Sequence, residues 1–208
     1  MSVAILFVLA GNALHSVLSG GSEGVASLLL LLALEGSLLL AVALFGPWKY
    51  GRSWASLGLV SGLKGGTPLA LAVFGGIFLF SVAYTLLVRF LSLEALLPPG
   101  LPEAMSQGAL QRALGLAATV MAAPLAEEVF FRGFLLPAFA LQWGFLPGAV
   151  LTSSLFALSH VSLGLLLPAF VSGLLLAWLY RRTGSLWNCV LAHGIQNALA
   201  FGAALMGS

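Results

Sequence analysis

Long apolar runs cover nearly the whole of this 208-residue chain, and they restrict its fold more than any other feature. Only 7% of the residues are charged and 61% are hydrophobic, whereas a soluble domain carries roughly 25% charged residues. No polar surface could cover so apolar a chain, so lipid must be its solvent. In lipid, helices satisfy their backbone hydrogen bonds within one segment. We therefore predict an all-α, polytopic membrane helical bundle, with residues 1–208 forming a single domain.

A membrane-spanning helix needs about 20 predominantly apolar residues. By this criterion the sequence predicts about seven spans. They cover residues 3–18, 25–45, 67–91, 112–140, 147–162, 163–180 and 185–206. The fourth is unusually long, and its Gly133 and Pro137 predict a break in the helix, because proline interrupts the helical hydrogen bonds.

Basic residues between the spans predict the orientation in the membrane. Lys49, Arg52 and Lys64 lie between the second and third spans, and Arg181 and Arg182 lie between the sixth and seventh. Four spans separate these two loops, so both can face the cytoplasm, as the positive-inside rule requires. The N-terminus would then be inside and the C-terminus outside. The argument depends on the short fifth span crossing the membrane.

The linker at residues 47–66 has the composition of a segment at the membrane surface. Trp48, Tyr50 and Trp54 stand near the two basic residues Lys49 and Arg52. Aromatic rings mixed with basic side chains favour the headgroup region. We expect a short interfacial helix in this linker.

Several ionisable residues lie inside the apolar runs. They are Glu35, Glu127, Glu128, His160 and His193. A charged side chain at the bilayer centre costs about 2.5–3.5 kcal/mol on insertion scales, so residues kept there usually face a polar cavity and have partners. A functional site is the natural hypothesis for four of them, whereas Glu35 stands apart and a structural role is expected for it.

The stretch "AAPLAEEVFFRGF" contains two glutamates and an arginine. Glu128 and Arg132 are four residues apart, so they share one helix face and can form an ion pair. Glu127 lies about 100° further around the helix. The geometry therefore separates a structural glutamate, Glu128, from a freer one, Glu127. Taken alone, these three residues are equally well explained as a structural charge network.

Two further residue pairs favour a functional site over a structural charge network. Phe156 and His160 are four apart on one apolar helix, and His193 and Asn197 are four apart on another. A single histidine in an apolar helix is more often a core residue with one hydrogen bond. Because unpartnered polar groups cost several kcal/mol in lipid, we expect the polar residues of these three helices to meet in one polar intramembrane cavity.

Such a set is suited to attack of water on a carbonyl group. A buried glutamate can act as a general base and then as a general acid, histidine can orient the water, and asparagine can donate to an oxyanion. The sequence has no H-E-x-x-H, the motif of standard zinc proteases. Zinc held by Glu127, His160 and His193 nevertheless stays chemically reasonable.

The three motifs together resemble the signature of the CAAX protease and bacteriocin-processing (CPBP, also abortive-infection) family of intramembrane endopeptidases. They read Glu127-Glu128-x-x-x-Arg132, Phe156-x-x-x-His160 and His193-x-x-x-Asn197. All three are intact, and they place the catalytic core at about residues 112–206. The resemblance implies an all-helical membrane fold with a cavity that opens towards the membrane.

The resemblance also implies a role for each motif residue. Glu127 would activate the water that His160 helps to hold, and His193 and Asn197 would stabilise the oxyanion. Glu128, Arg132 and Phe156 would support the site. A metal-free, glutamate-based mechanism without a cofactor is the preferred reading, and zinc is the alternative.

The expected partners are membrane lipid and a peptide or protein substrate that enters from the membrane, such as a C-terminal tail, a leader or a sorting peptide. A net charge of +2 without a basic cluster argues against nucleic acid. The small size favours a prokaryotic plasma membrane.

Two other functions compete with proteolysis. One is a non-catalytic membrane immunity or scaffold protein of the same fold. The other is a proton-coupled transporter or channel, which the lack of an internal repeat disfavours.

Overall fold

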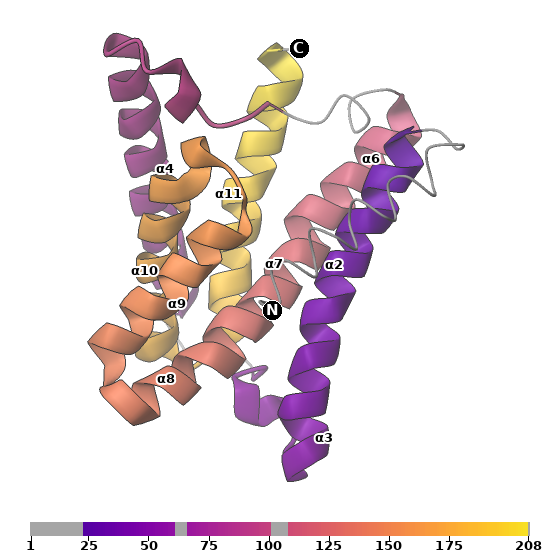
Figure 1. Cartoon of the computed structure of the whole chain (residues 1–208), viewed down its shortest axis with the longest axis vertical. Helices are drawn as coiled ribbons and strands as arrows, with labels where there is room; N and C mark the ends of the chain where they lie inside the picture. Colours follow the sequence, from indigo (N-terminus) through magenta and orange to yellow (C-terminus); the bar gives the residue numbers. More distant parts are fainter. Residues whose placement is uncertain (1–22, 61–65, 101–107, 208) are drawn as a thin grey trace.

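The computed structural model describes residues 23–60, 66–100 and 108–207, and every regular element in these ranges is helical (Figure 1). The predicted all-α class is confirmed for this part of the chain. The α-helices are α2 (Glu23–Phe45), α3 (Pro47–Tyr50), α4 (Gly66–Phe90), α6 (Ala109–Ala117), α7 (Ala123–Glu128), α8 (Leu136–Trp143), α9 (Phe145–Ser159), α10 (Leu163–Thr183) and α11 (Leu186–Gly207). The 3₁₀ turns η1 (Trp54–Leu57) and η2 (Glu94–Leu96) and the π-helical segments η3 (Ala118–Ala122) and η4 (Val129–Leu135) connect or interrupt them.

Five helices of the described part are long and apolar enough to cross a membrane, so this is a multi-pass membrane protein. They are Leu29–Tyr50, Gly66–Phe90, Ala109–Trp143, Leu163–Thr183 and Leu186–Met206. The prediction of about seven spans therefore needs correction. The expected fifth span is α9, whose 15 residues extend only about 22 Å, and the expected first span at 3–18 lies outside the described residues.

The predicted break near Gly133 and Pro137 is wrong, because residues 109–143 form one continuous helix. Two π-helical segments, η3 and η4, lie in it, and each precedes a proline, Pro124 or Pro137. A proline donates no hydrogen bond and its ring collides with the preceding turn. The wider π turn accommodates that ring without breaking the helix.

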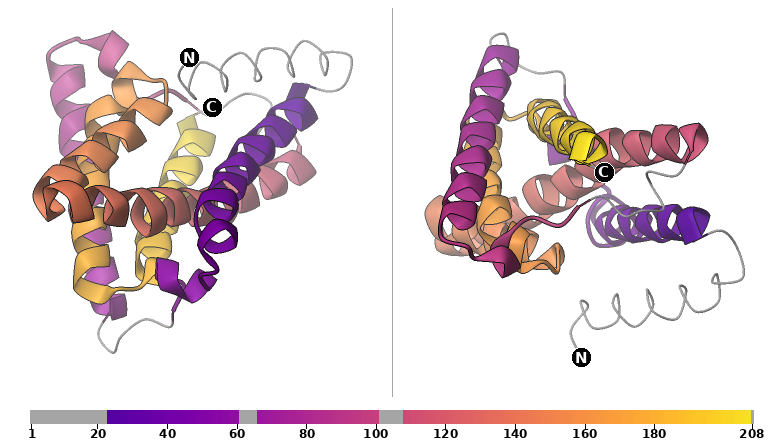
Figure 2. Two further views of the ribbon diagram at one scale, coloured as in Figure 1. Left: turned by 60° about the horizontal axis from the view of Figure 1, so that its bottom comes forward. Right: turned by 90° about the horizontal axis from the view of Figure 1, so that it is seen from above.

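The helices form two groups that α11 joins. In the views of Figures 1 and 2, α2 lies beside the long helix α6–α8, while α4 and α10 lie together on the other side. Helix α11 packs against α4 and α10 and also against α7 and η3 of the long helix, and α9 packs against α8 and α10. This position of α11 brings its polar residues to the long helix.

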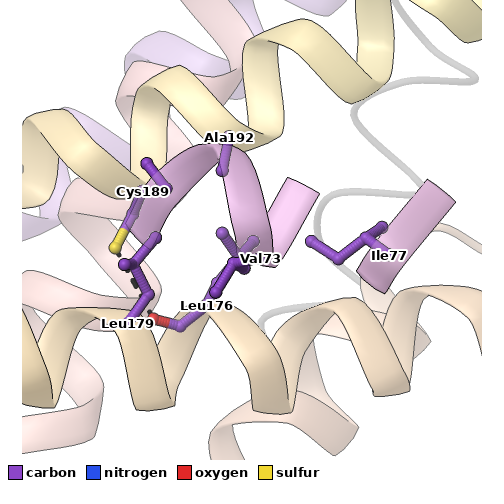
Figure 3. Packing of buried hydrophobic residues seen from close by; sticks show 7 residues of the cluster. Val73, Ile77, Leu176, Leu179, Cys189 and Ala192 are labelled. Atoms are coloured by element: carbon purple, nitrogen blue, oxygen red, sulfur yellow. Dashed lines mark hydrogen bonds between the residues drawn. The ribbon is translucent and has the colours of Figure 1, made fainter. Parts of the chain in front are cut away.

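A small apolar core holds α4, α10 and α11 together (Figure 3). Val73 and Ile77 of α4 meet Leu176 of α10 and Ala192 of α11, and all four are at most 5% exposed. The Cys189 thiol donates to the Leu176 carbonyl oxygen at 3.5 Å. This contact links α11 directly to α10.

The two basic loops lie at the same end of the molecule, as the sequence predicts. The backbone N–H of Leu186 donates to Gly58 O at 2.8 Å, and the Tyr180 hydroxyl donates to Leu57 O at 3.0 Å. Gly58 has φ 92°, and a Cβ there would lie 2.6 Å from the Tyr180 ring, so only glycine suits this turn. Although α9 is short, the chain runs through an even number of helices between the loops: α4, the long helix, α9 and α10.

The predicted interfacial segment is also helical at this end. It consists of α3 and η1, and the side chains of Trp48 and Tyr50 are 66% and 64% exposed. Lys49 lies 5.4 Å from the Tyr50 ring centre. Exposed aromatic rings beside a cation are typical of the headgroup layer.

Candidate active site

The predicted ion pair between Glu128 and Arg132 is confirmed. Arg132 Nη1 donates to Glu128 Oε1 at 2.8 Å, and the two side chains are 2% and 0% exposed. Nδ1 of His193, on α11, lies 2.9 Å from the same carboxylate oxygen. An ionised carboxylate only accepts hydrogen bonds, so this Nδ1 carries a proton, and Glu128 ties α11 to the long helix.

The second glutamate lies on the other side of the same imidazole ring. Glu127 Oε2 is 3.6 Å from His193 Nε2, and the Glu127 side chain is 17% exposed. The ring of His193 therefore stands between the two glutamates. This supports the separation of a fully buried, paired Glu128 from a more accessible Glu127. No ion pair joins Glu127 to His160 in the described ranges.

Phe156 connects the second motif to the other two. Its ring is 2% exposed and makes edge contacts with His160 at 4.8 Å and His193 at 5.8 Å between ring centres. The Arg132 guanidinium lies 4.4 Å from its centre, a cation–π distance. Phe156 thus lies in contact with both histidines and with the buried guanidinium of Arg132.

His160 ends α9 and turns one nitrogen towards its own helix. Its Nδ1 lies 2.8 Å from the Phe156 carbonyl oxygen. Since a carbonyl oxygen only accepts, Nδ1 is the donor, and Nε2 is left for another partner. Val161, the next residue, has φ 49°, which is unusual for a β-branched residue and turns the chain sharply after the histidine.

Asn197 is anchored by the π-helical segment η3. Its Nδ2 donates to Thr119 O at 2.9 Å. The backbone N–H of Ala123 bonds to Ala118 O, and Pro124, five residues after Thr119, has no N–H to offer. The Thr119 carbonyl is therefore free to accept from another helix. One of the two amide protons of Asn197 is used in this bond, and the other remains.

An open groove of about 750 Å³ lies between α4, α10 and α11, with the segment 97–100 at its edge. His160, His193 and Asn197 all line it, so the second and third motifs share one groove. Ser81, Thr85, Arg89, Ser172 and Gln196 supply the rest of its polar lining. Glu127 is not among the lining residues and connects to the groove through its contact with His193.

The residues do not fit the alternative zinc site. Within the described ranges, no three His, Cys, Asp or Glu side chains are grouped so that they could hold a metal ion. Glu127 and His160 in particular have no contact with each other among the described residues. We therefore derive no step through a metal ion.

Three residues near the motifs were not predicted from the sequence. A Cβ on Gly194 would lie 2.7 Å from the Val120 carbonyl oxygen, so this glycine permits the close approach of α11 to η3. Gln196 lines the groove with its buried Oε1 unpartnered, and Pro124 releases the carbonyl that Asn197 uses. The available signals were a glycine directly after His193, an amide three residues after His193, and a proline three residues before Glu127.

Comparison with known proteins agrees with this arrangement. No curated protein and no solved structure matches the chain significantly. One protein-family model does match, over residues 109–199, and it is described as "Type II CAAX prenyl endopeptidase Rce1-like". The match contains all three motifs and most of the predicted core at 112–206. Residues 109–199 are thus a domain of the Rce1-like CAAX endopeptidase (CPBP) family, which is a family of intramembrane proteases.

Proposed function

We propose that this protein is an intramembrane endopeptidase that uses Glu127 to activate water, without a metal ion. The observation that carries the proposal is the placement of the His193 ring between Glu127 and Glu128, in contact with a groove that His160 and Asn197 also line. These groups come from three separate helices of an apolar bundle. Their meeting is expected of a reaction site that needs water inside the membrane.

In this mechanism Glu127 is the general base. It takes a proton from a water molecule as the water oxygen attacks the peptide carbonyl, and it then gives the proton to the departing amine. His160 presents its Nε2 to the same groove and helps to hold the water.

Asn197 and His193 stabilise the oxyanion that forms on the carbonyl oxygen. Asn197 is held by Thr119 O at 2.9 Å, so its second amide proton is oriented in advance, which is the property of an effective oxyanion donor. His193 contributes through Nε2 when that atom carries a proton, since Nδ1 is committed to Glu128. Arg132 and Phe156 keep Glu128 and both histidines in place.

The groove favours an extended peptide as substrate. It opens to the surface of the protein, and polar side chains line it among apolar ones. A C-terminal tail, a leader or a sorting peptide that lies in the membrane fits this shape.

The test is cleavage by purified protein in detergent, with fluorogenic peptides that end in apolar tails. Glu127→Gln removes the base but keeps the shape of the side chain. We expect cleavage to fall about 10²–10⁴-fold, the usual contribution of a general base, with unchanged thermal stability. Wild-type activity should survive a strong chelator.

Other outcomes would overturn specific parts of the proposal. Full activity of Glu127→Gln would remove Glu127 as the base. Activity that a chelator abolishes and zinc restores would reinstate the metal alternative. Binding of these peptides without any cleavage would favour the non-catalytic scaffold.

A further inference from the structure

Glu35 lies on the face of α2 that packs against the catalytic helix. It precedes Leu39 by four residues and Val42 by seven, so the three share one helix face. Val42 is fully buried against Val129 of η4, and Leu39 packs against the same cluster beside Leu125 of α7. The helical repeat therefore points Glu35 towards α7, the helix that carries Glu127.

Among the residues that the structure describes, none near Glu35 carries a charge that would neutralise it. The residue is 8% exposed, and its buried Oε2 has no hydrogen-bond partner. No ion pair in the described ranges includes it, and the Arg132 guanidinium is engaged by Glu128. An isolated carboxylate in such a place is far less favourable than a neutral carboxyl group.

Helix α2, which carries Glu35, packs directly against α7, which carries Glu127. This packing brings the carboxyl group of Glu35 within range of the charge of Glu127. Two like charges that approach each other in an apolar medium cannot both persist, so one of the two groups holds a proton. Glu127 is the more exposed of the two acids, so a charge on Glu127 costs less than a charge on Glu35. The proton therefore belongs on Glu35.

We propose that Glu35 is a positioning residue for the general base. Its neutral carboxyl group donates a hydrogen bond to the Glu127 carboxylate through one water molecule, and so orients the oxygen that accepts the proton of the attacking water. Glu35 keeps its own proton throughout the reaction. This inference rests on the proposed function of Glu127 and lies outside the three motifs.

The test compares two substitutions that differ only in hydrogen bonding. Glu35→Gln keeps a neutral donor of the same shape, whereas Glu35→Leu removes the donor and fills the space with an apolar group. We expect Glu35→Gln to keep kcat within about threefold and Glu35→Leu to lower kcat about tenfold to a hundredfold, less than loss of the base itself. KM should change little in both. Ser37→Ala on the same helix is the control, because Ser37 bonds only to its own helix at Leu34 O.

Thermal stability separates this role from a purely structural one. Replacing this buried acid by leucine removes the cost of burying a polar group, which offsets the lost bond to Glu127. The melting temperature should therefore stay equal or rise, while activity falls. A structural role would instead lower stability in Glu35→Leu, and the inference would then be wrong. Unchanged kcat in Glu35→Leu would also overturn it and leave Glu127 as base untouched, provided that Glu127→Gln is inactive.

A double-mutant cycle tests the contact without any assay of activity. Glu35→Leu removes the donor and Glu127→Gln removes the carboxylate that accepts from it, so their effects on the melting temperature should be non-additive. Additive shifts would show that the two groups do not interact. This result would refute the inference even if no peptide substrate were found, and it would not depend on the proposed reaction.

Discussion

Glu128 is the residue on which the geometry of the site depends. One of its oxygens accepts from Arg132 at 2.8 Å and from His193 at 2.9 Å, and the whole side chain is buried. Paired in this way, the carboxylate costs far less than it would alone in an apolar interior. The same oxygen fixes which nitrogen of His193 is protonated, and so which nitrogen faces Glu127.

Arg132→Ala should destabilise the protein as well as inactivate it. The substitution leaves Glu128 buried without its cation, and removing one member of a buried pair costs about 3–5 kcal/mol. We expect a lower melting temperature in detergent and a lower yield of folded protein. Arg112→Ala, an exposed arginine on the same long helix, is the control and should stay within about 0.5 kcal/mol of wild type. Normal melting with lost activity would instead make Arg132 catalytic.

At the scale of elements, the contact between α11 and η3 decides whether the motifs meet. Gly194 lets the two backbones approach, and Thr119 O, which Pro124 leaves free, binds Asn197. Both features depend on the π-helical turn. They set the distance between His193 and the glutamates of α7.

Gly194→Ala should separate the third motif from the first. The added methyl would lie 2.7 Å from Val120 O, and a backbone oxygen cannot move aside easily. We expect at least about a tenfold loss of activity, since misplacement of about 1 Å can cost a hundredfold. Gly202→Ala on the same helix has nothing within 4 Å and should be neutral or stabilising, because alanine favours helix. Equal effects of the two substitutions would contradict this explanation.

These elements also show how far the sequence can predict the site. The Glu128–Arg132 pair follows from a spacing of four in one helix, so it was predictable. The position of His193 between two glutamates was not, because it depends on how closely α11 packs against the long helix. Proline within a helix predicts a disturbance, but whether the helix breaks or widens into a π turn depends on its packing. The break predicted at Pro137 failed for this reason.

At the scale of the whole molecule, the two basic loops define one side of the membrane. Arg52 and Arg182 belong to loops joined by hydrogen bonds from Leu186 to Gly58 and from Tyr180 to Leu57. Loops in direct contact must lie on the same side of a bilayer. The positive-inside rule then assigns this side to the cytoplasm.

Labelling of single cysteines in intact cells can check this orientation. The chain has one cysteine, Cys189, which is fully buried and should not react with an impermeant maleimide. We expect Glu94→Cys, at the opposite end, to be labelled from outside. Ser53→Cys and Arg182→Cys should react only after the cells are opened. Labelling of either one in intact cells would reverse the topology.

Because α9 is short, the hydrophobic thickness of the molecule differs from one side to another. Its outward side chains are apolar, with Leu146 and Leu158 72% and 61% exposed, yet it extends only about 22 Å against about 38 Å for the 25 residues of α4. Lipid cannot match both lengths, and hydrophobic mismatch thins the bilayer beside the shorter helix. His160 ends that helix, so bulk water comes nearest to the reacting groups where the surrounding membrane is thinnest.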